Sequence, residues 1–298
     1  MDPLLDRFIS ESRLMVDEAL DRYIPSPEIE PRVLHEAMRY SLFAGGKRVR
    51  PILAMAAAEM IGADKFCVIP LAAALECIHT YSLIHDDLPP MDDDDLRRGK
   101  LTSHKVFGES TAILAGDALL TVAFEILSGF ETSRIIPSHT IVEVIRDVAV
   151  ACGSRGLIAG QIMDMIYEGE AADDSIIEKI MLNKTGALIR ASVTNGARLA
   201  GANRKEIDIL FQFGEKLGKI FQIKDDLLDL EGDATKLGKA VRKDDKRGKA
   251  TYPSVHGPDR SKKLVMSLLA EANKMIEPFG KKAQILILLA EYVSQRVN

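Results

Sequence analysis

Six aspartates lie within ten consecutive positions, residues 86 to 95, directly after a long apolar segment. Pro89 and Pro90 predict that a helix ends here, because proline lacks an N–H donor and displaces the preceding residue from the helical region. Asp86 and Asp87 would then lie at the C-terminus of a buried helix, where the helix dipole disfavours negative charge. Neighbouring carboxylates add a repulsion of about 4 kcal/mol at about 4 Å and an effective dielectric of about 20.

A divalent cation would relieve this crowding. Mg²⁺ takes oxygen ligands and is usually held in proteins by one or two carboxylates together with substrate phosphates. The alternative is a solvated acidic turn, which is what most isolated runs of aspartate form. The choice between the two depends on the rest of the chain.

The composition is that of an ordinary soluble globular protein. Hydrophobic residues make up 47% of the 298 residues and charged residues 28%. A net charge of −5 with scattered basic residues gives no reason to expect nucleic-acid binding. No secretory signal is visible, and no uncharged apolar run reaches the roughly 18 residues of a membrane span. Cys67, Cys77 and Cys152 are widely spaced and predict free thiols. We therefore expect a cytoplasmic protein without stable membrane insertion.

Helical periodicity extends over nearly the whole chain, without the alternation typical of strands. The predicted helices cover about residues 3–23, 27–45, 48–61, 71–88, 109–127, 138–167, 173–200, 204–230, 258–275 and 281–297. Ser26 is the expected N-cap of the second, and residues 231–257 are expected to form a surface loop. We find no repeat or linker, so the sequence predicts a single all-α domain over residues 1–298, folded as a helical bundle.

A second acidic cluster lies near the end of the predicted helix 204–230. Asp225 and Asp229 are four residues apart and share a helix face, while Asp226 is offset by about 100°. A solvent-facing pair is the ordinary interpretation of such spacing, but this helix is among the more apolar ones. Two acidic clusters that face each other across a cavity would instead hold Mg²⁺ ions and bind a diphosphate.

Basic and polar residues that could bind phosphate accompany the two clusters. Each alone is more typical of a surface charge or an ordinary polar side chain, and a lone histidine is more often a core residue. Together they predict an anion site, because a helix start, arginine forks and lysines favour phosphate oxygens. They are Lys47, Arg50, His79, Arg97, Arg98, Lys184, Thr185, Gln222 and Lys239.

Several motifs of the sequence together resemble those of a known family. DDLPPMDDDDLRRG at residues 86–99 resembles the first aspartate-rich motif of the trans-isoprenyl diphosphate synthases, and FQIKDDLLD at 221–229 resembles the second. GGKRVRP (45–51), GQIMD (160–164), KTG (184–186) and GKATYP (248–253) resemble further landmarks in the family's order. The resemblance covers about residues 30–255, and the four-residue spacer between Asp87 and Asp92 is typical of bacterial farnesyl and plant-type geranylgeranyl diphosphate synthases.

The resemblance implies an isoprenoid-synthase helical bundle around a central active-site cavity, working as a homodimer. It implies about three Mg²⁺ ions per active site, for which Mn²⁺ is expected to substitute. The implied metal ligands are Asp86, Asp87, Asp92, Asp225, Asp226 and Asp229. Arg97, Lys184, Thr185, Gln222 and Lys239 would bind the allylic diphosphate, and Lys47, Arg50, His79 and Arg98 would bind isopentenyl diphosphate. Asp86, Asp92, Asp225, Lys184 and Lys239 are the expected catalytic residues.

The implied reaction is head-to-tail condensation of isopentenyl diphosphate with dimethylallyl or geranyl diphosphate. The allylic C–O bond ionises, the double bond of isopentenyl diphosphate attacks the cation, and a proton is lost. Tyr81, five residues before Asp86, is expected to form the floor of the prenyl pocket, since Ser82 is too small to block it. We therefore expect farnesyl diphosphate (C15) as the product, with geranylgeranyl diphosphate (C20) as the alternative.

Three other functions remain to be weighed. A class I terpene cyclase shares the first aspartate-rich motif, but usually carries an Asn/Ser/Glu triad where this chain has Asp225, Asp226 and Asp229. A non-catalytic subunit of a synthase usually loses one aspartate motif, and this chain keeps both. An acidic Ca²⁺-binding helical protein would explain the aspartates but not the ordered cationic residues.

Overall fold

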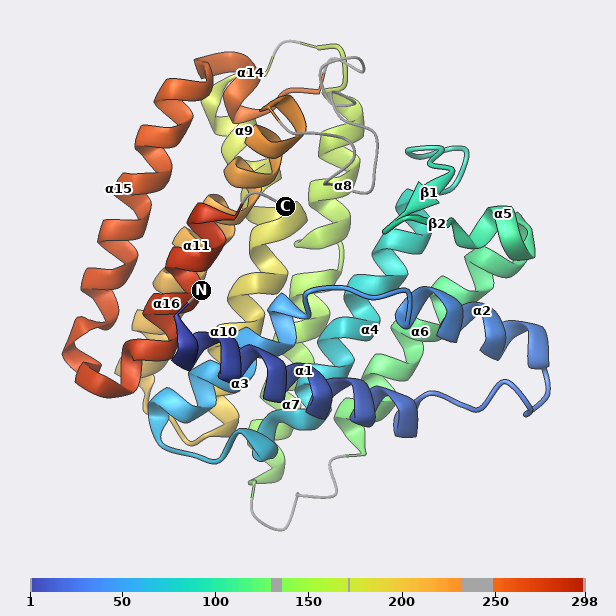
Figure 1. Ribbon diagram of the computed structural model, residues 1–298, viewed down its shortest axis with the longest axis horizontal. Coiled ribbons are helices and arrows are strands. Elements are labelled where there is room, and N and C mark those ends of the chain that lie inside the picture. Colours follow the sequence, from blue (N-terminus) through green and yellow to red (C-terminus); the bar gives the residue numbers. More distant parts are fainter. Residues whose placement is uncertain (1, 130–135, 171, 232–248, 297–298) are drawn as a thin grey trace.

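The computed structural model describes residues 2–129, 136–170, 172–231 and 249–296. These residues form a helical bundle in which most long helices run side by side and α1 crosses them (Figure 1). The first half of the chain forms α1 (Pro3–Tyr23), α2 (Arg32–Leu42), α3 (Val49–Ile61), η1 (Lys65–Val68), α4 (Ile69–Asp86), β1 (Leu96–Arg97), β2 (Lys100–Leu101), α5 (Ser103–Phe107), α6 (Glu109–Ser128) and α7 (Ser138–Cys152). The second half forms α8 (Leu157–Ile166), α9 (Asp174–Ile180), η3 (Met181–Gly186), α10 (Ala187–Leu199), α11 (Arg204–Glu231), α14 (Tyr252–His256), α15 (Pro258–Ile276), η4 (Glu277–Ala283) and α16 (Gln284–Gln295). The expected all-α fold is confirmed.

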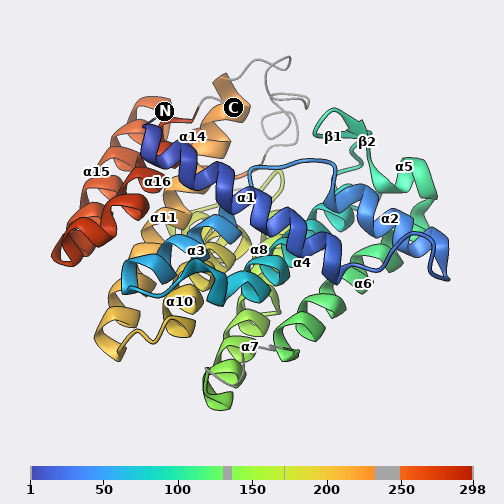
Figure 2. The same ribbon diagram turned by 60° about the horizontal axis from the view of Figure 1, so that its bottom comes forward.

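The core is built around α3, α4 and α10, which are buried along most of their length. α3 and α4 are also apolar on nearly all sides, and such helices are stable only when other helices surround them. In Figure 2 α1 crosses α3 and α4, and α10 packs on α3 and α11. Gly196 of α10 allows close packing on α3, because a Cβ at this position would overlap the Ala54 carbonyl. The end of α4 that carries the first aspartates is thus held on a rigid core.

Two helices are long and apolar enough to cross a membrane by length and composition alone. The segment Lys65–Asp86, which contains α4, is 78% buried inside the protein, as expected of a core helix. The second, α6, is only 39% buried. Unlike α4, α6 therefore leaves much of its apolar surface uncovered in the single chain.

Three predicted elements differ from the structure. The second helix begins at Arg32 rather than at residue 27, because Pro31 cannot donate inside a helix and takes the N-cap position instead. The helix expected over residues 138–167 is divided into α7 and α8. It breaks at Gly153–Gly156, where a Cβ on either terminal glycine would overlap backbone carbonyls of α7. These breaks have local causes.

The third difference is a short antiparallel hairpin, β1 and β2, which follows the acidic segment. Its turn residues Arg98 and Gly99 both have positive φ, at 56° and 76°, as the tight two-residue turns of hairpins require. The hairpin separates the side chains of Arg97 and Arg98, which the sequence places next to each other. Of the expected loop 231–257, residues 232–248 lie outside the described residues, and residues 252–256 form α14.

Candidate active site

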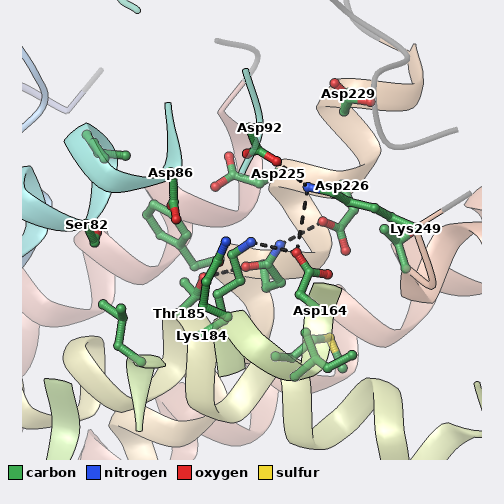
Figure 3. A pocket seen from close by; sticks show the side chains of 18 of the residues that line it. Ser82, Asp86, Asp92, Asp164, Lys184, Thr185, Asp225, Asp226, Asp229 and Lys249 are labelled. Carbon is green, nitrogen blue, oxygen red and sulfur yellow. Dashed lines mark hydrogen bonds and ion pairs between the residues drawn. The ribbon is translucent and has the colours of Figure 1, made fainter. Parts of the chain in front are cut away.

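An open cavity of about 400 Å³ lies between the C-terminal end of α4, α8, η3 and α11 (Figure 3). Its lining combines many charged and polar side chains with apolar ones from Leu83, Leu157, Ile177, Ile180 and Met181. Most of the residues that the sequence proposed as ligands line this one space. They are Arg50, His79, Asp86, Asp92, Arg97, Arg98, Lys184, Thr185, Gln222, Asp225, Asp226 and Asp229.

The first acidic wall is formed by Asp86 and Asp92. Beyond the end of α4 the chain folds back, and the amide of Asp92 donates to the carbonyl of Asp86 over 2.8 Å. This hydrogen bond brings two carboxylates six positions apart in sequence to the same side of the cavity. Burial raises the pKa of Asp86 to about 6, and Asp92 contributes in the same direction against the opposing effect of Lys184. Burial is thus the main cause of the raised pKa of Asp86, and the repulsion between carboxylates expected from the sequence is a smaller contribution.

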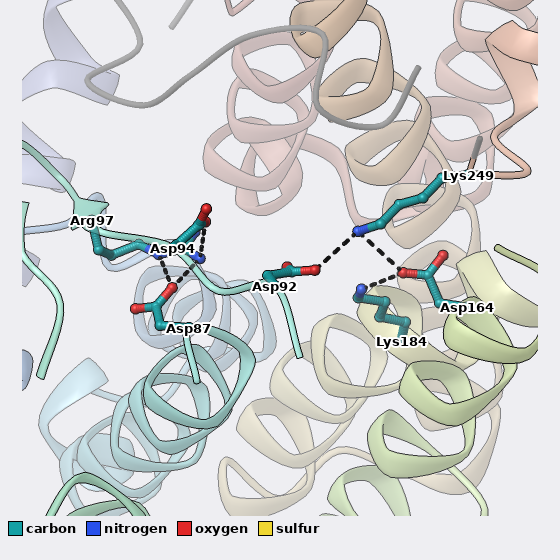
Figure 4. A network of polar contacts seen from close by, with 7 residues as sticks. All are labelled: Asp87, Asp92, Asp94, Arg97, Asp164, Lys184 and Lys249. Atoms are coloured by element: carbon teal, nitrogen blue, oxygen red, sulfur yellow. Dashed lines mark hydrogen bonds and ion pairs between the residues drawn. The ribbon is translucent and has the colours of Figure 1, made fainter. Parts of the chain in front are cut away.

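Asp87 does not lie on this wall. Its carboxylate is buried and accepts from Arg97, with Oδ1 2.5 Å from Nη2 (Figure 4). Arg97 also contacts Asp94, at 3.3 Å. Burial acts against the charge of Arg97, but the ion pair with Asp87 outweighs it and raises the pKa of the guanidinium. Asp87 thus pairs with Arg97 and is not among the residues that line the cavity, and its expected role as a metal ligand stays a prediction. Consecutive residues at a helix end point in directions about 100° apart, and Arg97 is the available partner on the other side.

The second acidic wall is the C-terminal part of α11, where Asp225, Asp226 and Asp229 all line the cavity. Gln222, one turn earlier, donates to Asp226 over 2.8 Å and accepts from the Thr185 hydroxyl. Asp225 forms an ion pair with Arg296, at 2.7 Å. The second wall is thus tied to η3 on one side and to the end of the described chain on the other.

Lys184 and Thr185 lie in η3, a turn of π-helix between α9 and α10. Such wide turns are rare inside helices and frequently occur at functional sites. Gly160 of α8 packs directly on the backbone of Lys184, and a Cβ there would overlap it. Lys184 then reaches into the cavity and forms an ion pair with Asp164, at 2.6 Å. The sequence predicted an uninterrupted helix over these residues, and the π turn is what directs both side chains to the cavity.

Lys249 connects the two sides of the cavity. Its Nζ lies 3.5 Å from Asp92 and 3.7 Å from Asp164 (Figure 4). Lys249 and Asp164 were not among the ligands predicted from the sequence, although both fall in segments that carry the family resemblance. Lys239, a predicted ligand of the allylic diphosphate, lies outside the described residues.

A basic corner lies beside the walls and contains Arg50, His79 and Arg98. Burial lowers the pKa of Arg50 to about 10, so it stays charged at neutral pH. Burial also lowers the pKa of His79 well below its usual value, and Arg50 and Arg98 add to the effect. His79 is therefore a neutral imidazole at pH 7. Lys47 is outside the cavity lining, but burial and the nearby Arg296 lower its pKa while Asp225 acts against this.

Mg²⁺ fits the donors of this cavity, since carboxylate oxygens are the ligands it prefers. Among the described residues, no three acidic, histidine or cysteine side chains converge closely enough to hold a metal ion by themselves. Mg²⁺ commonly takes only one or two protein carboxylates, and waters and substrate phosphates complete its shell. Asp86 and Asp92 on one wall and the aspartates of α11 on the other offer this partial set of ligands.

The two residues proposed to control chain length lie on α4 behind the first wall. Ser82 lines the cavity, and Tyr81 does not. The Tyr81 ring is buried and packs edge-on against His85, with centroids 5.7 Å apart. Its buried hydroxyl has no hydrogen-bond partner in the described part of the chain.

Arg296, which sequence reasoning missed, lies behind the cavity lining and contacts two of its residues, Asp225 and Phe221. It is buried, stacks on the Phe221 ring at 3.8 Å and donates to the Phe221 carbonyl over 2.9 Å. Seventy-five positions separate it from Phe221, and no local pattern could have indicated this contact.

Comparisons with known proteins agree with this geometry. Residues 31–285 match the model of the polyprenyl synthetase family. The chain is 43% identical to the farnesyl diphosphate synthase of Geobacillus stearothermophilus, over 98% of both chains. It is 45% identical to the large subunit 1 of the heterodimeric geranylgeranyl pyrophosphate synthase of Arabidopsis thaliana, covering 95% of this chain and 77% of that protein. The crystal structure of an FPP/GFPP synthase from Zymomonas mobilis superposes with a TM-score of 0.88 at 36% identity, covering 99% of this chain and all of the other.

The chain belongs to the polyprenyl synthetase family. It is a trans-prenyltransferase that makes prenyl diphosphates, with the isoprenyl-synthase helical fold of that family. The terpene cyclase and Ca²⁺-binding alternatives are thereby set aside.

The raised pKa of Asp86 predicts a specific dependence of stability on pH. In the metal-free protein, ionisation of this half-buried carboxyl is harder than in the unfolded chain, so the free energy of unfolding falls as pH rises through about 6. Asp86→Asn should remove this fall and be more stable than the wild type at pH 8 by about 1 kcal/mol, a figure reduced for partial exposure. The two proteins should be equally stable near pH 4. Denaturant unfolding in EDTA across this pH range measures the difference.

Asp95→Asn is the matched control, because Asp95 lies in the same segment but is exposed and bonded to Lys105. This control should not be more stable than the wild type at pH 8. A lower stability of Asp86→Asn than of the wild type at every pH would contradict the crowding of the first wall.

Proposed function

We propose that this trans-prenyltransferase is a farnesyl diphosphate synthase. It would condense isopentenyl diphosphate head-to-tail with dimethylallyl diphosphate and then with the resulting geranyl diphosphate. The observation that carries the chemistry is the pair of acidic walls, with Asp86 and Asp92 opposite the aspartates of α11, in a cavity that apolar side chains also line. A diphosphate between the walls and a prenyl chain against the apolar side chains would fill this arrangement.

The metal ligands in this proposal are Asp86, Asp92, Asp225, Asp226 and Asp229, and Asp87 is reassigned to hold Arg97 in place. Bound Mg²⁺ would supply the positive charge that neutralises a departing diphosphate. Arg97, Lys184, Thr185 and Gln222, with Lys239 from the segment outside the described residues, would bind the allylic diphosphate. Lys184 lies beside Asp164 and would exchange this partner for a phosphate oxygen, a charge-assisted hydrogen bond of comparable kind.

Isopentenyl diphosphate would bind at the basic corner, through Arg50, Arg98, Lys47 and the neutral imidazole of His79. These residues lie beside the first wall, so the two diphosphates would be held next to each other. When the allylic C–O bond breaks, its electron pair leaves with the diphosphate. The double bond of isopentenyl diphosphate then attacks the allylic cation. The departed diphosphate would accept the proton lost afterwards, because the cations of the basic corner present only donors and burial, with the nearby arginines, makes the neutral imidazole of His79 a weak base.

The apolar part of the cavity lining is as necessary as the charges. Leu83, Leu157, Ile177, Ile180 and Met181 form it and would surround the reacting carbons. Water in contact with the cation would convert it to an alcohol, so a cavity that excludes water directs the reaction to condensation.

The function is tested by incubating purified protein with isopentenyl diphosphate, each allylic starter and Mg²⁺, with products identified by mass spectrometry. We expect farnesyl diphosphate as the main product and no turnover in EDTA. Asp225→Ala should lower kcat by about a hundredfold or more while the melting temperature of the metal-free protein is maintained. Full activity in EDTA would contradict the proposal. Asp208→Ala, on α11 but outside the cavity lining, is the matched control and should retain activity.

The C15 product rests on Tyr81. A prenyl tail that extends from the first wall along α4 would pass Ser82, and the ring of Tyr81 lies about 7.5 Å behind Asp86 along the helix. The ring is held by burial and by its contact with His85. A geranylgeranyl product (C20) is the second candidate. It is favoured by the relatives named for that product and by the absence of Tyr81 from the present cavity lining.

Tyr81→Ala separates these two candidates. If the ring closes the pocket, its removal should lengthen the main product by at least one isoprene unit. Tyr81→Phe retains the ring and removes only the unpartnered hydroxyl, so it should give the wild-type product. Product length is read by mass spectrometry. An active Tyr81→Ala enzyme with unchanged products would show that Tyr81 does not set the length.

We also propose that the enzyme is a homodimer that pairs through the outer face of α6 and its neighbours. Ile113 and Leu114 of α6, Val142 of α7, and Ile158 and Ile162 of α8 are exposed in the single chain. An apolar helix that is mostly uncovered in a protein with soluble relatives is typical of a subunit interface. The Arabidopsis relative is named as a heterodimer subunit, so a different partner is the alternative occupant of this face.

Leu114→Glu should convert the dimer to a monomer, because it places a charge at the centre of this face. Sedimentation equilibrium of the wild type and the variant measures the change. Met266→Glu on α15 is a matched control, since Met266 is as exposed as Leu114 but lies on another helix, and it should leave the mass unchanged. A monomeric wild type would contradict the proposed homodimer.

A cytoplasmic location is proposed as well, and the three free cysteines support a reducing compartment.

A further inference from the structure

Arg48 lies between Lys47 and Arg50 in the sequence, yet its side chain points away from the cavity into the core. It is the N-cap residue of α3 and has a left-handed backbone, with φ 52° and ψ 36°. A residue other than glycine is uncommon in this conformation and persists where its surroundings hold it there. Arg48 is 3% exposed, so contacts in the core are what hold it.

The guanidinium of Arg48 joins several separate elements. Its Nε donates to Asp17 of α1 over 2.9 Å, and Nη1 donates to Glu76 of α4 over 2.7 Å. Nη2 donates to the carbonyl of Leu42, the last residue of α2, over 2.9 Å. Glu76 is 1% exposed, so this ion pair is buried, with both charges satisfied in a fork geometry that only arginine offers.

The residues proposed to bind isopentenyl diphosphate lie close to Arg48 along the chain or are carried by elements next to its loop. Lys47 precedes Arg48 directly, and Arg50 follows it after Val49. Arg98 donates to the Gly45 carbonyl, and a side chain at Gly46, where φ is +136°, would overlap the Arg98 guanidinium. His79 is three residues after Glu76 on α4 and lies on the same face. The Arg48 guanidinium therefore joins the loop to α4, and Arg98 of the hairpin bonds to the same loop.

We propose that Arg48, fixed by Glu76 and Asp17, is the positioning residue of the isopentenyl diphosphate site. This inference rests on the proposed function, since it assigns the basic corner to that substrate. Arg48 does not touch substrate. It sets the backbone of residues 45–50 against α4, so that the cations of the basic corner are already arranged when the diphosphate arrives. Displacement of this loop should weaken the binding of isopentenyl diphosphate and leave the binding of the allylic diphosphate unaffected.

Steady-state kinetics with each substrate varied in turn tests the inference. Arg48→Lys retains the charge and loses the fork. It should raise KM for isopentenyl diphosphate by about tenfold to a hundredfold, the usual effect of misplacing a site by about 1 Å. KM for the allylic substrate and kcat at saturation should stay within about twofold. Glu76→Gln should act in the same direction, and Asp17→Asn, at the exposed end of the network, should act more weakly while it keeps the fold.

Two comparisons separate positioning from stability. The double variant Arg48→Met/Glu76→Met removes both charges of the buried pair, so neither is left unpaired. Its free energy of unfolding should therefore recover relative to the single changes. Its KM for isopentenyl diphosphate should remain high. Arg190→Lys, which weakens a partly exposed arginine–glutamate pair with Glu215 between α10 and α11, should leave both KM values unchanged. A wild-type KM for isopentenyl diphosphate in folded Arg48→Lys or Asp17→Asn and in the double variant would overturn the inference. Absence of prenyl transfer by the wild type would instead overturn the proposed function.

Discussion

The repulsion between carboxylates is the constraint on which the rest of the site depends. The chain places two acidic walls across one cavity and, before any substrate arrives, pairs their members with cations of its own. Arg97 holds Asp87, Lys249 lies between Asp92 and Asp164, Lys184 holds Asp164, and Arg296 holds Asp225. Several of these cations are the residues that would bind a diphosphate. Substrate and Mg²⁺ would thus exchange partners with an existing ionic network, so the charges need not be brought together from solvent.

The helices fix the positions of the two acidic walls, although the charges on the walls attract nearby cations and repel each other. Because α4 is apolar on all sides and packed in the core, its C-terminal end cannot move to relieve the crowding at Asp86. The second wall is fixed through Gln222 and Thr185 to the π turn η3. At the other end, Arg48 fixes the loop of the basic corner to the same α4. One rigid helix thus orients both the acidic and the basic parts of the site.

The sequence predicted the fold class, most helices and the residues whose positions follow from helix geometry. Asp225, Asp226 and Asp229 share a cavity because they share α11, and Asp86 lies where the prolines end α4. The sequence did not indicate that Asp87 pairs with Arg97, because this contact depends on the position of a later hairpin. The π turn at Lys184 follows from packing between helices, which no residue pattern reveals. Lys249 and Arg296 reach the site across long sequence separations, and only the assembled fold brings them there.

Calorimetric titration with inorganic diphosphate measures most directly whether the two walls act together. With Mg²⁺ present, the wild type should bind diphosphate, and in EDTA the binding should weaken by at least about a hundredfold, since the carboxylates then repel the anion. Asp92→Asn neutralises a carboxylate of the first wall and Asp226→Asn one of the second. Each change alone should remove most of the Mg²⁺-dependent gain in diphosphate affinity. Binding that is equally tight in EDTA, or unaffected by neutralising one wall, would contradict a metal-bridged diphosphate held between the two walls.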